Sequence, residues 1–345
     1  MKKPIRVLIV DDCKVTTQLL YAILSNETDI EVVGCAQNGQ MAIKLVKELK
    51  PDLITMDIYM PVMDGVEATR AIMQQCPTPI IIISSHANER QTELTFSALQ
   101  AGALSIIEKP ERVLHDGFDK LQKHIVNSVR ALSEVKVVSR RSPLPAESQI
   151  KSTGATVSAI KIIALGSSTG GPEALNYIIS ALPASFPVPL VITQHITEGF
   201  LPGLVHWLQH KTSLVLEIAE NNQKLLPGHV YFAPDNHHLL IKREVIPIAV
   251  LESSPPIGHF RPSITPLFSS LAKNYPESAI GGLLTGMGGD GAPGLLEMRQ
   301  AGCITFAQSK ETSVVFGMPA VALSIKATDL SIDLEKIPEF LTKLL

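Results

Sequence analysis

A serine flanked by glycines lies in the second half of the chain, within the segment Gly-Ser-Ser-Thr-Gly-Gly at positions 166–171. An apolar run at 160–165 precedes this segment, and a helix-like stretch follows from Pro172. Between a strand and a helix, the motif Gly-x-Ser-x-Gly presents a serine hydroxyl as a nucleophile, and Ser168 is its central serine. Bends of this kind also cradle phosphate groups or simply turn the chain, so the motif alone leaves all three interpretations open.

A nucleophilic serine needs a base, and the base needs a third group that orients it. His195 follows the next apolar run, 190–194, so we expect it at the same sheet edge as Ser168. Asp290 lies in a glycine-rich segment after the run 280–283, from which it could reach the far nitrogen of His195. Considered alone, His195 would be interpreted as an ordinary histidine at a strand end whose hydrogen bonds are satisfied. Three candidates at three strand ends instead predict a Ser-His-Asp triad.

A second group of reactive side chains follows the apolar runs of the first half. Asp11 and Asp12 come after the first run, Asp57 after the third, Ser84 ends the fourth and Lys109 follows the fifth. The carboxyl ends of parallel strands converge at one sheet edge, and carboxylates that close together are costly without a hard cation such as Mg²⁺. A metal site with one hydroxyl and one ammonium suits phosphoryl transfer to a carboxylate.

These residues resemble a response-regulator receiver domain over positions 4–125, and the loop Met-Pro-Val-Met-Asp-Gly at 60–65 also matches that family. The resemblance implies that Asp57 accepts the phosphoryl group from a phosphodonor histidine kinase, and that Ser84 and Lys109 bind this group. It also implies a set of Mg²⁺ ligands, which are Asp12, Asp57 and the Tyr59 carbonyl directly and Asp11 through water.

Two further details concern the end of the receiver segment. The resemblance implies a cis peptide bond between Lys109 and Pro110, which the X-Pro linkage tolerates better than other peptides do. Ile106 stands where many receivers have an aromatic switch residue. A relay from Ser84 to an aromatic ring is therefore not expected here, whereas phosphorylation is.

Both sites need a framework that brings strand ends together, and the alternation of apolar runs with helix-period segments indicates one. Strands that are apolar throughout are buried on both faces, as in a parallel sheet covered by helices. We therefore predict an N-terminal, doubly wound, five-stranded parallel receiver domain and a C-terminal, doubly wound α/β domain that carries the predicted triad and an inserted β-hairpin. The predicted strands are 5–10, 30–36, 53–57, 80–84 and 104–108 in the first half, and 161–165, 190–194, 215–218, 280–284 and 304–308 in the second. The hairpin is predicted from 229–233 and 238–241, and a closing helix from 336–345.

The chain of 345 residues is long enough for two domains with separate cores. Residues 133–158 are rich in serine, include two prolines and carry no sustained apolar period, which indicates an exposed linker. We place the receiver domain at 4–125, the linker at 126–158 and the esterase domain at 159–345.

Composition excludes several classes of function. The net charge of −3 and the lack of long Lys/Arg blocks give no electrostatic footprint for nucleic acid. Four widely spaced cysteines suggest neither a disulfide framework nor a zinc site. His206 and His210 have the spacing of a helical metal pair, but no third ligand is evident. No stretch approaches the roughly 20 apolar residues that span a bilayer, so we expect a cytoplasmic protein that is not inserted in the membrane.

The second half resembles the catalytic domain of the chemotaxis protein-glutamate methylesterases, the CheB family, over positions 159–345. The matching segments are 166–171, Gln194-His195, Arg261-Pro262-Ser263 and 284–291, in this order. Receiver, linker and esterase together also match the architecture of that family. The resemblance implies hydrolysis of glutamate γ-methyl esters on the cytoplasmic helices of chemoreceptors during adaptation, and often of receptor glutamine amides. It implies no metal or organic cofactor for this step.

The resemblance carries further expectations for the esterase half. We expect the backbone N–H groups of Thr169 and Met287 to form the oxyanion hole, and phosphorylation of Asp57 to raise esterase activity by relieving a block. Gly289 stands where an asparagine is usual, and Thr265-Pro266 where Asp-Val is common. Neither departure is expected to touch a triad residue.

Two alternative functions stay open. One is a receiver-controlled module that binds receptors without hydrolase activity, although such a module has no physical need for an intact Ser168, His195 and Asp290. The other is an esterase that acts on a non-receptor acyl group, because surface shape rather than the triad selects the substrate.

Overall fold

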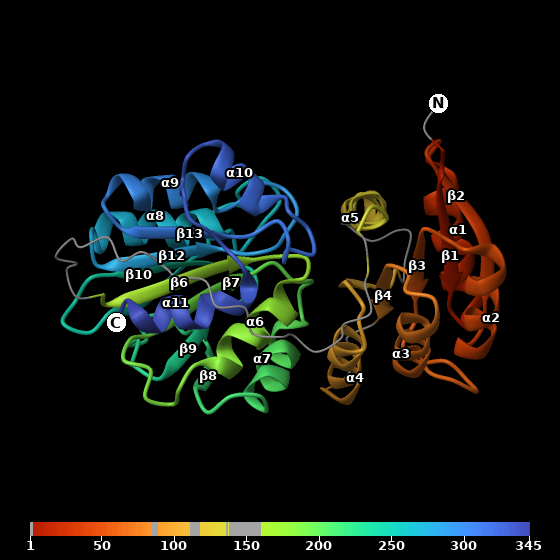
Figure 1. Cartoon of the computed structure of the whole chain (residues 1–345), viewed down its shortest axis with the longest axis horizontal. Coiled ribbons are helices and arrows are strands. Elements are labelled where there is room, and N and C mark those ends of the chain that lie inside the picture. The colour runs from red at the N-terminus through yellow and green to blue at the C-terminus, as the bar shows by residue number, and fades with distance from the viewer. Residues whose placement is uncertain (1–2, 85–88, 111–117, 136, 138–159) are drawn as a thin grey trace. The chain divides into compact units, whose positions relative to one another are not determined.

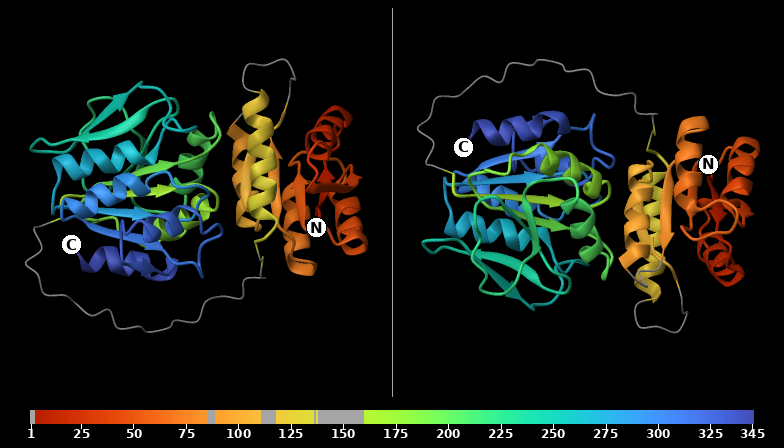
Figure 2. Two further views of the ribbon diagram at one scale, coloured as in Figure 1. Left: turned by 90° about the horizontal axis from the view of Figure 1, so that it is seen from above. Right: turned by 90° about the horizontal axis from the view of Figure 1, so that it is seen from below.

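The computed structural model describes residues 3–84, 89–110, 118–135, 137 and 160–345 of the chain (Figure 1). The described residues fold as two compact units, one containing the N-terminal five-stranded sheet and the other the C-terminal seven-stranded sheet. Both units alternate strands with helices, as the sequence pattern predicts (Figure 2). Among the described residues, no helix combines the length and the apolar character that crossing a membrane requires.

The first unit contains a five-stranded sheet in which every neighbouring pair is parallel. The strand order is β2 (Ile30–Ala36), β1 (Ile5–Val10), β3 (Leu53–Met56), β4 (Ile80–Ser84) and β5 (Ser105–Glu108). The helices are α1 (Lys14–Ser25), α2 (Gly39–Leu49), α3 (Gly65–Gln75), α4 (Glu89–Gln100) and α5 (Phe118–Leu132). β3 and β4 are buried along their whole length, which explains their uninterrupted apolar sequences.

The second unit contains a seven-stranded sheet that is also parallel throughout. Its strand order is β14 (Ser331–Ile332), β13 (Ile304–Gln308), β12 (Ala279–Leu283), β6 (Ile162–Ser167), β7 (Leu190–Gln194), β9 (His229–Phe232) and β8 (Val215–Ile218). A separate antiparallel pair consists of β10 (His238–Lys242) and β11 (Ile248–Glu252). The helices are α6 (Gly171–Ala181), α7 (Leu201–Gln209), α8 (Ile264–Asn274), α9 (Ala292–Gln300), α10 (Met318–Ser324) and α11 (Ile337–Lys343), with a 3₁₀ turn at Leu334–Lys336.

Chain order and sheet order change direction at β6, which lies between β7 on one side and β12 on the other. In open α/β sheets such a reversal leaves a crevice beyond the carboxyl ends of the strands, where ligands bind. In the first unit the same reversal occurs at β1, between β2 and β3. The fold therefore provides one candidate site in each unit.

The predicted fold class is confirmed, with corrections to its details. The predicted hairpin partners are wrong, because β9 joins the parallel sheet beside β7 and β10 pairs instead with β11. The residues His229–Phe232 are mostly buried, so this strand fits the sheet interior better than an exposed ribbon. The short edge strand β14 was not predicted, since two residues carry no recognisable period. Residue 126, the predicted start of the linker, lies inside α5, and 138–158 of that linker fall outside the described residues.

Candidate functional site

Ser168 follows β6 in a bend that leads directly into α6. The bend requires glycine at position 170, because φ there is 78° and a β-carbon would approach Val314 within 2.6 Å. The neighbouring Ser167 is fully buried and donates its hydroxyl to the side chain of Gln194. Since Ser167 is committed to the core, the half-buried Ser168 is the serine that is presented to the crevice.

His195 lies beside Ser168 because β6 and β7 are neighbouring parallel strands. The backbone N–H of His195 donates to the Ser167 carbonyl at 2.9 Å. The Gln194 amide nitrogen donates both to the Ser168 carbonyl, at 2.9 Å, and to the His195 carbonyl, at 2.7 Å. Buried Gln194 thus fixes the main chain of the predicted nucleophile against that of the predicted base.

Asp290 reaches His195 from the loop after β12. Its Oδ2 lies 2.8 Å from His195 Nε2, and both side chains are nearly buried. The other ring nitrogen, Nδ1, is buried and has no hydrogen-bond partner among the described residues. With Nε2 donating to the carboxylate, the tautomer leaves Nδ1 as a proton acceptor. The structure therefore places the three predicted triad residues after the carboxyl ends of the neighbouring strands β6, β7 and β12.

The Asp290 carboxylate is surrounded by donors from the start of α8. Ser263 Oγ and Thr265 Oγ1 each donate to Oδ1 at 2.7 Å, and the Ile264 N–H donates to Oδ2 at 2.7 Å. Burial alone would raise the pKa of Asp290, but the hydrogen bond from His195, together with those from Ile264 and Ser263, outweighs it. They hold the pKa of Asp290 well below its ordinary value, so the carboxylate is permanently charged.

This network corrects the expectation for Thr265. The Thr265 hydroxyl contacts the Asp290 carboxylate directly and also accepts the Gly291 N–H at 2.9 Å. The helix start at α8 places it there, some 25 positions before Asp290, which sequence spacing does not reveal. Gly289 contacts no triad side chain in this way; a β-carbon there would meet Val321 at 3.2 Å.

The two amides predicted for the oxyanion hole flank the crevice. Neither the Thr169 nor the Met287 N–H donates to an acceptor within the described parts of the chain. Gly286 brings the second of these loops against the nucleophile, since a β-carbon at 286 would lie 2.7 Å from Ser168 Cβ. The Thr285 hydroxyl ties the loops together by donating to the Thr169 carbonyl at 2.9 Å.

The first unit brings its predicted carboxylates together at the carboxyl ends of β1 and β3. Ligand oxygens of Asp11, Asp12 and Asp57 lie within 4.8 Å of one another. An all-oxygen set of this kind fits Mg²⁺ in its donor chemistry. Lys109 Nζ lies 2.8 Å from Asp57 Oδ2 and 3.1 Å from Asp11 Oδ2, so it is the nearest positive charge.

Burial raises the pKa of Asp57 to about 6, although Lys109 acts in the opposite direction. Burial likewise raises the pKa of Asp11, against the attraction of Lys109. Two carboxylates whose charges are poorly compensated favour the arrival of a cation. The physical conditions for a metal site are therefore met by the side chains themselves.

The other residues predicted for the receiver site lie at the ends of β3, β4 and β5 or just beyond them. Ser84 is buried at the end of β4, and its carbonyl accepts the Lys109 N–H at 3.0 Å. Tyr59 is 39% exposed, two residues beyond Asp57, and Ile106 is buried in β5. The implied cis bond before Pro110 is wrong, because among the described residues the cis bond is Arg261–Pro262. The two isomers of an X-Pro bond differ little in energy, so sequence does not fix the choice.

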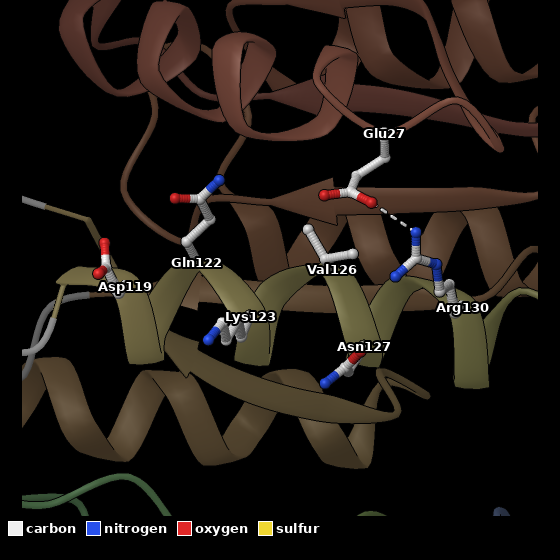
Figure 3. Close-up of a pocket in the computed structure, with 7 residues that line it drawn as sticks. All are labelled: Glu27, Asp119, Gln122, Lys123, Val126, Asn127 and Arg130. Atoms are coloured by element: carbon white, nitrogen blue, oxygen red, sulfur yellow. Dashed lines mark hydrogen bonds and ion pairs between the residues drawn. The ribbon is translucent and has the colours of Figure 1, made fainter.

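The His206–His210 pair and a cavity beside α5 are not part of either predicted site. His206 and His210 place their Nε2 atoms 3.2 Å apart, but within the described residues they belong to no group of three or more metal-ligating side chains. A cavity of about 220 Å³ lies beside α5 in the first unit (Figure 3). Arg130 at its end pairs with Glu27 and Asp29. Both acidic and basic side chains line this cavity, and none of the predicted site residues is among them. The lining residues are Glu27, Asp119, Gln122, Lys123, Val126, Asn127 and Arg130.

Comparison with known families identifies both domains. Residues 163–341 match the CheB methylesterase family, and residues 7–117 match the response regulator receiver domain. The chain belongs to the CheB methylesterase family. It is therefore a hydrolase whose catalytic unit is preceded by a receiver domain.

Relatives in the CheB family share the full length of the chain. A protein of Syntrophus aciditrophicus named protein-glutamate methylesterase/protein-glutamine glutaminase 1 is 43% identical, over 99% of this chain and 98% of its own. A Myxococcus xanthus protein with the same name and the number 3 is 44% identical, over 99% and 94%. The catalytic domain of Thermotoga maritima CheB covers 55% of this chain and all of its own, with 37% identity and a TM-score of 0.53.

Sequence reasoning missed the residues that support the predicted triad. Gln194 was noted only as part of a matching segment, although it bonds to both Ser168 and His195. Buried His238 carries no role in the sequence-based predictions, but its Nδ1 accepts the Ser263 N–H at 3.0 Å. The available signal for both was a polar residue within an otherwise apolar strand, since buried polar groups need partners.

Proposed function

We propose that this protein hydrolyses glutamate γ-methyl esters on the cytoplasmic helices of chemoreceptors, with a second activity on receptor glutamine amides. The names of the full-length relatives support both substrates. The observation that carries the chemistry is the hydrogen bond of 2.8 Å between Asp290 and His195, which leaves Nδ1 as the acceptor next to the Ser168 bend.

His195 accepts the proton of Ser168 at Nδ1 as Ser168 Oγ attacks the acyl carbon. As the bond from the acyl carbon to the leaving group breaks, the same proton passes to the methoxide oxygen, which leaves as methanol, or to the amide nitrogen, which leaves as ammonia, and an acyl-enzyme remains. Water deprotonated by His195 hydrolyses this intermediate and restores the Ser168 hydroxyl. Charged Asp290 stabilises the imidazolium in both steps, and the Thr169 and Met287 amides stabilise the oxyanion, at typically about 3 kcal/mol for one donor.

The receiver unit supplies the control. Asp57 accepts a phosphoryl group from a histidine kinase. Asp12, Asp57 and the Tyr59 carbonyl would hold Mg²⁺ directly, and Asp11 would act on the ion through water. When bound, the ion neutralises the oxygens of the incoming phosphate. Lys109 moves its pairing from Asp57 to the phosphoryl group, and the Ser84 hydroxyl donates to it. Phosphorylation raises esterase activity, and the protein acts in the cytoplasm, where the receptor helices lie.

Methanol release from methylated receptor tests this function. Ser168→Ala should lose at least about 10⁴-fold in turnover while keeping Mg²⁺-dependent labelling of Asp57 by a small phosphodonor. The control is Ser180→Ala, a serine on α6 that bonds only to its own helix. Near-normal turnover of Ser168→Ala would refute the nucleophile, and unchanged labelling of Asp57→Asn would place the phosphoryl group elsewhere.

A truncated chain tests the control by the receiver. Without residues 1–150, the esterase should turn over faster than the unphosphorylated full chain and should not respond to phosphodonor. A truncated protein slower than the full chain would contradict relief of a block. It would indicate instead that the receiver is an obligatory activator.

A further inference from the structure

Phe260 lies flat against the imidazole of His195. The two ring centroids are 3.8 Å apart and the ring planes differ by 3°. Only 6% of the His195 side chain is exposed, so the phenyl ring covers one face of the imidazole and excludes water from it. The sequence gives no warning of this contact, because 65 positions separate the two residues.

A tight turn presents the phenyl ring. Ile257 and Phe260 exchange two backbone hydrogen bonds of 3.1 Å across the turn, and Gly258 adopts a φ of 63° within it. From Phe260 the chain continues directly into Ser263 and Ile264, both of which donate to Asp290. One segment therefore fixes both the ring that covers His195 and the carboxylate that binds it.

The two contacts constrain different motions of the imidazole. The hydrogen bond from Nε2 to Asp290 holds one point of the ring but permits rotation about an axis through that point. A stacked ring at van der Waals distance blocks this rotation, because turning the imidazole would drive its edge into the phenyl face. The direction in which Nδ1 points therefore depends on Phe260.

We propose that Phe260 is a positioning residue of the esterase: it fixes the plane of His195 so that Nδ1 faces Ser168. This inference rests on the proposed function of the triad. Misplacement of a reacting group by about 1 Å costs roughly 10²-fold in rate. Loss of the phenyl ring should therefore lower kcat about 10- to 100-fold and change KM little.

The experiment compares three variants of the full chain. Phe260→Leu keeps an apolar cover but removes the ring, Phe260→Tyr keeps the ring, and Ile257→Ala removes an exposed side chain from the same turn. We expect kcat to fall in Phe260→Leu, to recover within about threefold of wild type in Phe260→Tyr, and to stay unchanged in Ile257→Ala. In NMR spectra, the His195 ring protons should lose their upfield ring-current shift in Phe260→Leu and keep it in Phe260→Tyr.

Each contrary result identifies its own failure. A normal kcat in Phe260→Leu, or a higher KM at constant kcat, would overturn the positioning role, the second by making Phe260 a substrate contact. An unchanged NMR shift in Phe260→Leu would refute the stack itself. Persistent activity of Ser168→Ala would instead refute the proposed function. The two failures can be told apart, because the NMR result does not depend on turnover.

Discussion

Asp57 and Asp290 each follow a buried parallel strand, and their side chains are only 3% and 7% exposed. Their pKa values are nevertheless shifted in opposite directions. Burial raises the pKa of Asp57 to about 6 despite its contact with Lys109. For Asp290, burial is outweighed by His195 and by donors from three consecutive residues, 263–265, so its pKa is held well below the ordinary value.

The difference shows that burial alone does not decide how a carboxylate behaves. The number of donors aimed at the two oxygens decides it. A carboxylate that has to form a bond to phosphorus, the role proposed for Asp57, needs an oxygen that is not already saturated by protein donors. A carboxylate that has to orient a histidine and stay charged benefits from saturation, as in Asp290.

Replacing Asp290 should give the largest effect of this comparison. Asp290→Asn removes the charge and presents an amide to donors that need an acceptor, so we expect turnover to fall by about 10³- to 10⁴-fold. The assay is methanol release from methylated receptor. Asp329→Asn is the matched control, because Asp329 pairs with Arg299 at the surface of the same unit. A loss of less than tenfold in Asp290→Asn would contradict the assigned role.

Replacing Asp57 should instead stabilise the protein. Because the pKa of Asp57 in the folded state, about 6, lies above the ordinary 3.8, the folded state binds more protons between these values. Stability therefore falls as the pH rises through this window. Without Mg²⁺, Asp57→Asn should stabilise the first unit by up to about 3 kcal/mol at pH 7 and hardly at all below pH 4.

Hydrogen exchange of the β1 and β3 peptides in the full chain measures this stability. Mg²⁺ should slow exchange in the wild type and have much less effect in Asp57→Asn. The control is Asp52→Asn. The Asp52 carboxylate is exposed, accepts the Arg6 N–H at 2.8 Å and does not belong to the group of three metal-binding carboxylates. Destabilisation by Asp57→Asn at pH 7 would show that Lys109 compensates the buried charge after all.

The smallest effect should come from a single donor to Asp290. Thr265→Val removes one hydroxyl that donates to Oδ1, while the other donors remain. We expect turnover to fall about tenfold, in line with one hydrogen bond to a charged group. Thr265→Ser should restore most of the activity, because it returns the hydroxyl. Equal losses in both variants would assign the effect to packing of the methyl group.

The sequence by itself determined most of the strands, the doubly wound parallel class of both units and the residues at the strand ends. Apolar runs bounded by turn residues report burial, and the carboxyl ends of parallel strands converge whatever the details of packing. For this reason Ser168, His195 and Asp290, as well as Asp11, Asp12, Asp57 and Lys109, were found without coordinates.

Tertiary structure alone decided how each of these groups is held. The donors at 263–265 and the ring of Phe260 lie 25 or more positions from the residues that they contact, and no periodicity encodes such contacts. β10 pairs with β11 and not with β9, because β9 lies in the parallel sheet between β7 and β8. Even the opposite charge behaviour of Asp57 and Asp290 follows from the three-dimensional count of donors, because the two residues have the same side chain.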